Sequence, residues 1–213
     1  MKVNIKKEGK EETYNFISSW SDVTLETWVK IVQAETGSKV QEAEETLASL
    51  SNMPKNLIKQ LSLGDVAIIM RKMAELQSRQ DTVLKKVIEI DGVEYGMHPN
   101  LEDITLGEYA DIETFIGTDL NKNLPELMAV LFRPIVARKN EVYSIEAYDG
   151  NIQVRAEIMK KMSAENVHSC LVFFWRFVME FLKIMPSFLT ERTHLIESQL
   201  QTETLQNDGG GSE

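Results

Sequence analysis

Two stretches of the chain share one pattern of apolar and polar positions. SWSDVTLETWVKI starts at Ser19 and NLEDITLGEYADI starts at Asn100, so Thr24 of the first stretch corresponds to Thr105 of the second at an offset of 81 residues. Threonine is a typical N-cap residue, and apolar residues follow each threonine at helical spacing. The pattern predicts a helix after each threonine. Only the second copy has the acidic residue of a capping box, Glu108.

Alternating apolar and polar residues precede both predicted helices. In the first copy, residues 3–6 and 13–17 flank a turn around Gly9. In the second, residues 87–90 and 93–95 flank Asp91-Gly92, and Asp-Gly between alternating residues is a strong hairpin signal. Each copy is therefore predicted to begin with a β-hairpin.

Further correspondences follow downstream. Leu47 and Pro54 match Leu127 and Pro134 at an offset of 80, which predicts a second helix that ends before each proline. Residues 58–66 then resemble residues 158–167 at an offset near 101, with Ser62 and Ser163 as N-cap candidates for a third helix. The larger offset indicates an insertion near residues 135–155 in the second copy, predicted to form a small extra hairpin.

The predicted fold class is α+β, mostly α, built from a duplicated unit of one β-hairpin and three helices. The first unit spans 1–79, the second spans 83–185, and 186–213 form an amphipathic segment and a flexible tail. The apolar helix at 163–185 is predicted to form the central core, because it is apolar on more than one face. The alternative is that two common helix starts coincide by chance. The shared order of hairpins, caps and prolines favours duplication.

Composition narrows the function classes. A chain of 213 residues, 43% of them hydrophobic, is long enough to bury a sizeable core. Its net charge of −10, without a basic cluster, argues against nucleic-acid binding and against anionic membranes. Cys170 is the only cysteine, so no intramolecular disulfide can form, and a reducing compartment is expected. The apolar run over 170–185 is too short and too charged to cross a bilayer.

No constellation of residues in the sequence points to catalysis. The three histidines, His98, His168 and His194, lack metal-ligand spacing with Cys170 or with one another. There is no Gly-x-Ser-x-Gly motif and no glycine-rich phosphate loop. Neighbouring acids are interpreted as solvated helix faces. We therefore predict no catalytic, cofactor-binding or metal-binding residues, no cofactor, and a protein that is not an enzyme.

At this point a family resemblance can be stated. Six segments of the chain resemble small proteins of tailed-bacteriophage morphogenesis modules. They are SWSDVTLETWVKI, LSNMPKNLIKQLSLGDV, LEDITLGEYADIETFI, LPELMAVLFRPI, YSIEAYDG and CLVFFWRFVMEFLK. Such proteins are described as tail assembly chaperones or virion structural proteins, and the resemblance covers most of residues 1–185. It implies a protein that engages other phage structural or tail proteins, or copies of itself, in the host cytoplasm during assembly or in the virion.

Candidate contacts for helix-in-groove or hairpin-edge docking are the insertion, the amphipathic C-terminal segment and the edges of the two hairpins. The candidate partner-binding residues are Tyr143 and Tyr148 in the insertion, and Phe188, Leu195 and Leu200 in the amphipathic C-terminal segment. Two other functions stay open. An acidic host-directed regulator that mimics DNA predicts acids gathered on one face. An enzyme with a cryptic site predicts a deep pocket that holds acids or a histidine with shifted pKa values.

Overall fold

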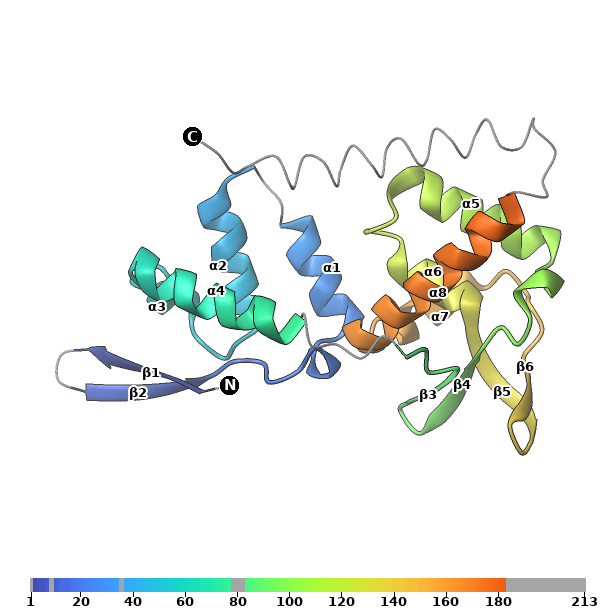
Figure 1. Cartoon of the computed structure of the whole chain (residues 1–213), viewed down its shortest axis with the longest axis horizontal. Helices are drawn as coiled ribbons and strands as arrows, with labels where there is room; N and C mark the ends of the chain where they lie inside the picture. Colours follow the sequence, from blue (N-terminus) through green and yellow to red (C-terminus); the bar gives the residue numbers. More distant parts are fainter. Residues whose placement is uncertain (1, 8–9, 35–36, 78–82, 183–213) are drawn as a thin grey trace.

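The first half of the chain folds as a hairpin followed by four helices (Figure 1). The computed structural model describes residues 2–7, 10–34, 37–77 and 83–182. Strands β1 and β2 pair alone as a two-stranded sheet. The elements are β1 (Lys2–Lys7), β2 (Lys10–Asn15), the 3₁₀ helix η1 (Trp20–Asp22), α1 (Leu25–Gln33), α2 (Lys39–Ser49), α3 (Lys55–Ile58) and α4 (Leu63–Gln77).

The second half repeats this order and adds one hairpin. Its four strands form a single antiparallel sheet in the order β3-β4-β5-β6. The elements are β3 (Val87–Ile90), β4 (Val93–Met97), the 3₁₀ helix η2 (Leu101–Asp103), α5 (Leu106–Asp119), α6 (Leu124–Leu131), β5 (Phe132–Lys139), β6 (Val142–Ile145), α7 (Ile152–Met159) and α8 (Ala164–Leu182). The predicted class, α+β and mostly α, is confirmed. Each half has four α-helices rather than the predicted three, because a short helix precedes the long last one.

The predicted turns of the second half form. Asp91 and Gly92 have φ angles of 52° and 78°, the left-handed conformation that a two-residue hairpin turn requires. The insertion folds as the β5–β6 hairpin, with a register shift between Ile135 and Ala137. Pro134 lies inside β5 opposite Tyr95, three residues after the last residue of α6, so it does not itself end that helix.

Backbone hydrogen bonds recur between the two halves at the offset of 81. They cover the 3₁₀ helix and the first turn of the helix that follows it. The matched donor–acceptor pairs are Asp22–Ser19 (3.2 Å) with Asp103–Asn100 (3.1 Å), Val23–Trp20 (3.2 Å) with Ile104–Leu101 (3.3 Å), and Trp28–Thr24 (3.0 Å) with Tyr109–Thr105 (3.0 Å). The repeat is therefore one of structure as well as of sequence.

The same offset holds where each hairpin meets the second helix. The Ile17 N–H donates to the Leu50 carbonyl at 3.0 Å, and the His98 N–H donates to the Leu131 carbonyl at 2.7 Å. The single bridge between Phe16 and Ser51 likewise corresponds to the Met97–Phe132 pair of β4 and β5. The offset of 80 predicted for this region is therefore wrong by one. The counterpart of Leu47 is Met128 rather than Leu127, and Pro54 and Pro134 are not equivalent.

The last two helices of each half are joined by the same turn, at an offset of 101. In the first half this turn connects α3 to α4, and in the second it connects α7 to α8. The matched donor–acceptor pairs are Lys59–Lys55 (3.1 Å) with Lys160–Ala156 (3.0 Å), Gln60–Leu57 (2.9 Å) with Lys161–Ile158 (3.0 Å), and Leu61–Ile58 (3.1 Å) with Met162–Met159 (2.9 Å). Ser62 and Ser163 then cap the following helices, as predicted.

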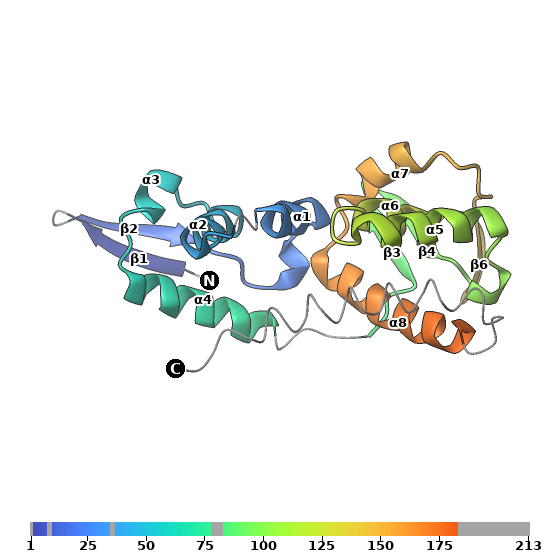
Figure 2. The same cartoon turned by 90° about the horizontal axis from the view of Figure 1, so that it is seen from above.

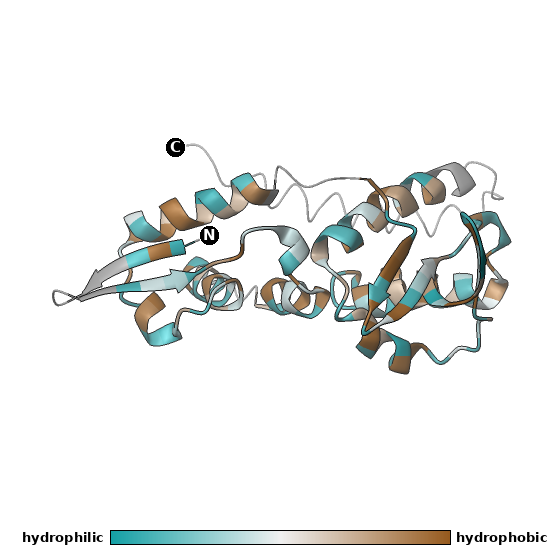
Figure 3. Cartoon of the chain, turned by 90° about the horizontal axis from the view of Figure 1, so that it is seen from below, coloured by the Kyte–Doolittle hydropathy of each residue, from teal (hydrophilic) through white to brown (hydrophobic). Residues whose placement is uncertain are grey.

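Helix α6, rather than α8, is the helix most enclosed among the described residues. All but one of its eight residues are buried, and it contacts α1, α5, α7 and β5. In α8 the buried residues include Val167, Cys170 and Phe174, which share one face, whereas Phe173 is 40% exposed. The prediction that α8 forms the central core is therefore wrong. The helix is amphipathic, and several of its aromatic side chains are only half-buried. Helix α4, the last helix of the first half, also alternates between hydrophilic residues, drawn in teal, and hydrophobic residues, drawn in brown (Figure 3).

Each half has its own apolar core cluster, and the buried members of each cluster include one residue from the other half. The first cluster lies under η1 and α2–α4 and includes Ala164 of α8. The second lies between α5–α8 and the four-stranded sheet and includes Leu25 of α1. The two predicted units, 1–79 and 83–185, therefore exchange core residues where they are in contact. Residues 186–213 lie outside the described residues. No helix in the described ranges combines the length and apolarity needed to cross a bilayer.

Candidate functional site

The first turn of α5 holds a deeply buried carboxylate. The Glu108 side chain is 1% exposed. The Thr105 N–H and hydroxyl both donate to Glu108 Oε2, at 2.8 and 2.7 Å, and the Glu108 N–H donates to Thr105 Oγ1 at 3.3 Å. This is the capping box that the sequence predicts. Its burial is not predicted, because capping boxes are common at exposed helix ends.

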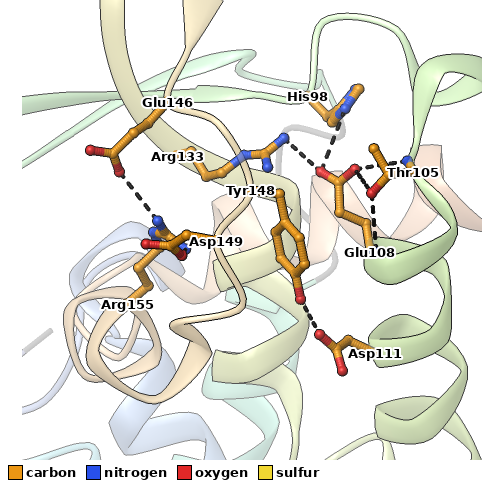
Figure 4. Close-up of polar contacts among 9 residues, drawn as sticks. All are labelled: His98, Thr105, Glu108, Asp111, Arg133, Glu146, Tyr148, Asp149 and Arg155. Carbon is orange, nitrogen blue, oxygen red and sulfur yellow. Dashed lines mark hydrogen bonds and ion pairs between the residues drawn. The ribbon is translucent and has the colours of Figure 1, made fainter.

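Arg133 of β5 binds the second oxygen of this carboxylate. The distance from Arg133 Nη2 to Glu108 Oε1 is 2.7 Å, and the Arg133 side chain is 4% exposed (Figure 4). His98, which follows β4, places its Nε2 3.8 Å from the same oxygen. Removing one partner of such a buried pair leaves the other charge without compensation, at a cost of about 3–5 kcal/mol.

Tyr148, from the segment after β6, covers this pair. The Arg133 guanidinium carbon lies 5.7 Å from the centre of the Tyr148 ring, which is within cation–π range. The Tyr148 hydroxyl donates to the Asp111 carboxylate of α5. Burial and this hydrogen bond raise the pKa of Tyr148. The phenol therefore stays protonated and links the segment after β6 to α5.

A second arginine ties the same segment to α7. Arg155 Nη2 lies 3.3 Å from Glu146 Oε2, and Arg155 Nη1 lies 2.7 Å from Asp149 Oδ1. The Asp149 carboxylate also accepts a hydrogen bond from the Asn151 N–H at 2.9 Å, in a turn where Gly150 has a φ angle of 72°. Arg133 and Arg155 therefore both contact the segment after β6, Arg133 through Tyr148 and Arg155 through Glu146 and Asp149.

The electrostatics of the cluster favour a charged glutamate and a neutral histidine. Burial alone would raise the pKa of Glu108, but the hydrogen bonds from Thr105 and the charge of Arg133 outweigh it and lower that pKa. Burial lowers the pKa of His98, against the opposing influence of Glu108. The buried charges of Glu108 and Arg133 therefore neutralise each other, and His98 adds no charge near neutral pH.

The arrangement holds several elements of the second half together. A general acid or base must reach the proton that it transfers, and both Glu108 and Arg133 are almost fully covered. Their partners are Thr105, His98 and Tyr148, which come from separate parts of the second half. The cluster therefore joins η2 and α5 to the sheet and to the segment after β6.

The predicted partner-binding residues fall into two groups. The Tyr143 hydroxyl donates to the Met97 carbonyl at 2.7 Å, and a Cβ at Gly96 would overlap the Tyr143 ring. Tyr148 packs on Arg133, as described above. Both tyrosines therefore hold the second half together, and their binding of a partner stays a prediction. Phe188, Leu195 and Leu200 lie outside the described residues.

Metal-ligating side chains do not gather in the described part of the chain. No group of three His, Cys, Asp or Glu side chains there could hold a metal ion. Cys170 is buried in the second core, and burial raises the pKa of its thiol to about 12. His168 is exposed on α8. Cys170 is therefore a core residue and not a poised nucleophile.

A small apolar hollow lies between the two halves. Trp20 and Trp28 pack edge to face across it, with ring centres 5.5 Å apart. Its volume of about 90 Å³ is below the ~300–1,000 Å³ usual for ligand pockets. The other lining residues are Leu124, Ala164, Val167, His168 and Leu171. Among the exposed large apolar side chains of the described residues, Leu63 and Leu106, at the starts of α4 and α5, have the highest exposed fraction, 83% each, followed by Val142 and Val40.

The buried ion pair is the part of the site that the sequence analysis misses. The available signal is Arg133 itself, a single charge within the apolar stretch LMAVLFRPI. A charged residue is almost never fully buried unless it is paired, so this stretch implies an acidic partner. The sequence does not identify Glu108 as that partner, because 33 acidic residues are available.

Comparison of the chain with known protein families, curated proteins and solved structures finds no match.

Proposed function

We propose that this protein is a non-enzymatic component of tailed-phage virion assembly that acts by binding other proteins. The observation that carries this proposal is that charged side chains are buried in the protein while large apolar side chains are exposed. Glu108 and Arg133 form an ion pair in the interior, whereas Leu63 and Leu106 place apolar side chains in water. Moving such a side chain from water onto a partner's surface favours binding.

The resemblance of six segments of the chain to phage morphogenesis proteins supports a phage origin. The partners would be other phage structural or tail proteins, met in the host cytoplasm during assembly or within the virion. Docking through helix starts needs no cofactor and no catalytic residue. The net charge of −10 keeps the free protein apart from other acidic proteins and favours basic surfaces on its partners.

A mass-spectrometric inventory of purified particles tests the proposal. Presence in stoichiometric copies identifies a virion component. Absence from particles, together with co-purification on a tail protein from infected cells, identifies an assembly chaperone. Co-purification with a host DNA-binding protein alone would contradict the proposal in favour of the DNA mimic.

A matched pair of variants strengthens the capture experiment. Leu106→Glu alters the start of α5, and Val40→Glu places the same charge in the first turn of α2, a different helix start, where Val40 is 71% exposed. We expect Leu106→Glu to reduce capture of the phage partner and Val40→Glu to leave it unchanged. Turnover of a metabolite by the purified chain, abolished by Glu108→Gln while the fold persists, would overturn the proposal in favour of an enzyme.

A further inference from the structure

The junction between the two halves is made by two helix starts. The start of α1 meets the start of α8, where Thr24 and Ser163 form an isolated antiparallel bridge. Leu25 is fully buried there, with an exposed fraction of 0%, and Ala164 is 7% exposed. Three backbone hydrogen bonds close the junction, from Leu25 to the Met162 carbonyl (2.7 Å), from Glu26 to the Lys160 carbonyl (2.9 Å), and from Ala164 to the Val23 carbonyl (2.7 Å).

Because of the repeat, each of the two helix starts at this junction has an equivalent helix start elsewhere in the chain. At the offset of 81, Leu106 at the start of α5 is the counterpart of Leu25. At the offset of 101, Leu63 at the start of α4 is the counterpart of Ala164. Leu63 and Leu106 are each 83% exposed. Within the described residues, both equivalent helix starts are therefore present and neither is covered.

The local geometry of the exposed helix starts matches that of the buried ones. All four helices begin with a hydroxyl cap at the same position, and each cap accepts a hydrogen bond from the N–H three residues on. The matched pairs are Thr27–Thr24 (3.2 Å) with Glu108–Thr105 (3.3 Å), and Asn166–Ser163 (3.2 Å) with Asp65–Ser62 (3.1 Å). An interface like the internal one therefore needs no rearrangement of these helix starts.

The two exposed helix starts lie far apart in one molecule. Helix α4 begins near the left end of the long axis, beside α3, and α5 begins at the right end (Figures 1 and 2). The two ends therefore cannot meet within one chain. They can meet between chains, and a contact between different surfaces of successive copies is head-to-tail.

Acidic side chains lie at the start of α5, whereas both signs of charge, including the exposed Asp65, lie at the start of α4. Glu102 and Asp103 are exposed just before α5. Lys55 and Lys59, on and after α3, are 54% and 64% exposed, although each also contacts a glutamate of α2. Lys59 is the counterpart of Lys160, whose carbonyl accepts a hydrogen bond at the internal junction.

We propose that the start of α5 in one copy docks on the start of α4 in the next copy, repeating between chains the α1–α8 junction. This inference deepens the proposed function, on which it rests, by identifying a second copy of the chain as a partner. Leu106 then packs as Leu25 does, against the turn before α4. Because the interface is head-to-tail and the ends are distant, association continues into short open chains rather than stopping at a symmetric dimer.

Sedimentation velocity of the full chain over a range of concentrations tests the proposal. We expect the average mass of the wild-type protein to rise with concentration. Leu106→Glu and Leu63→Glu should each weaken association by about tenfold or more, the effect of losing one buried leucine. Val40→Glu is the matched control and should associate as the wild type does. Both leucines are exposed, so circular dichroism should show the same fold in every variant.

Mixing the two variants separates this arrangement from a symmetric one. Leu106→Glu retains an intact α4 start, and Leu63→Glu retains an intact α5 start. At a concentration where the wild type just associates, each variant alone should be mostly monomeric, whereas an equimolar mixture should form dimers through the one intact interface. A wild-type chain that is monomeric at every concentration, or a mixture that stays monomeric while the wild type associates, would overturn the proposal. Detection of that monomer in purified particles would leave the proposed function standing.

Discussion

The two halves of this molecule share one set of backbone hydrogen bonds but stabilise their first long helix differently. In the first half, Thr24 caps α1 and Thr27 occupies the third position. In the second, Thr105 caps α5 and Glu108 occupies that position, paired with Arg133. At the offset of 81 the counterpart of Arg133 is Asn52, which accepts a hydrogen bond from the Asn15 N–H at 2.8 Å.

This difference between the two helix starts follows from the different number of strands in the sheets of the two halves. The first half has a two-stranded hairpin and a single bridge to the segment after α2, whereas in the second half the corresponding segment is β5 of a four-stranded sheet. The extra strands and the segment after them bury Glu108 and Arg133. A charge pair becomes a structural requirement only where the fold covers it. The following predictions compare equivalent positions, from the largest expected effect to the smallest.

The largest difference is expected between Glu108→Ala and Thr27→Ala. Glu108→Ala leaves the Arg133 charge buried without its partner and should lower the free energy of unfolding by about 3–5 kcal/mol. Thr27→Ala removes a half-buried hydroxyl and should change the free energy of unfolding by about 0.5 kcal/mol or less. Urea unfolding followed by circular dichroism measures both.

The double variant Glu108→Leu, Arg133→Met is the control for this pair. It removes both charges, so it should lose less stability than Glu108→Ala does alone. Equal losses in the two variants would contradict an important role for the uncompensated charge.

Equivalent leucines should behave in opposite ways. Leu25→Ala opens a cavity at the junction of the two cores and should cost about 2–5 kcal/mol. Leu106→Ala truncates a side chain that is 83% exposed and should change the stability of the monomer by about 0.5 kcal/mol or less. Thermal unfolding at low protein concentration, where self-association is absent, compares the two. Similar losses would show that the start of α5 is covered within one chain.

The two threonine caps should differ by a smaller amount. Thr24→Ala should cost about 1 kcal/mol, the usual effect of removing an N-cap hydroxyl. Thr105→Ala should cost about 2 kcal/mol, because its hydroxyl also donates to the buried Glu108 carboxylate. Replacing each threonine with serine keeps the hydroxyl and should restore most of the stability. Unfolding in urea measures all four variants.

The smallest effect is expected on mild acidification, and only from the second half. Burial lowers the pKa of His98 below its ordinary 6.5, so below pH 6.5 the unfolded chain takes up a proton that the folded chain does not. The free energy of unfolding should therefore fall as the pH drops below 6.5. The lowered pKa of Glu108 adds a second fall below pH 4.5, which is complete once the pH passes the folded-state pKa.

His98→Gln should flatten the dependence of stability on pH between about 5 and 7, the range set by the ordinary histidine pKa. His168→Gln, at an exposed position on α8, is the matched control and should leave it unchanged. A steep dependence that persists in His98→Gln would assign the effect to other groups.

Local features of this fold could be predicted because nearby residues decide them. The Asp91-Gly92 turn, the caps at Thr24 and Thr105 and the hairpin in the insertion all depend on side chains within a few positions of the backbone that they direct. Two predictions needed long-range information and were wrong. The central position was assigned to α8 from its apolarity, although the packing encloses α6, and the offset of 80 placed Leu127 opposite Leu47.

The sequence by itself determined the element types, the turns and the repeat, because hydrophobic period and capping chemistry act over a few residues. Only the tertiary structure decided which of two equivalent leucines is buried and which acid pairs with Arg133. Leu25 and Leu106 follow the same local motif, yet one meets the start of α8 and the other faces solvent. Burial depends on which segment, distant in the chain, arrives at a site, and no short stretch of sequence contains that information.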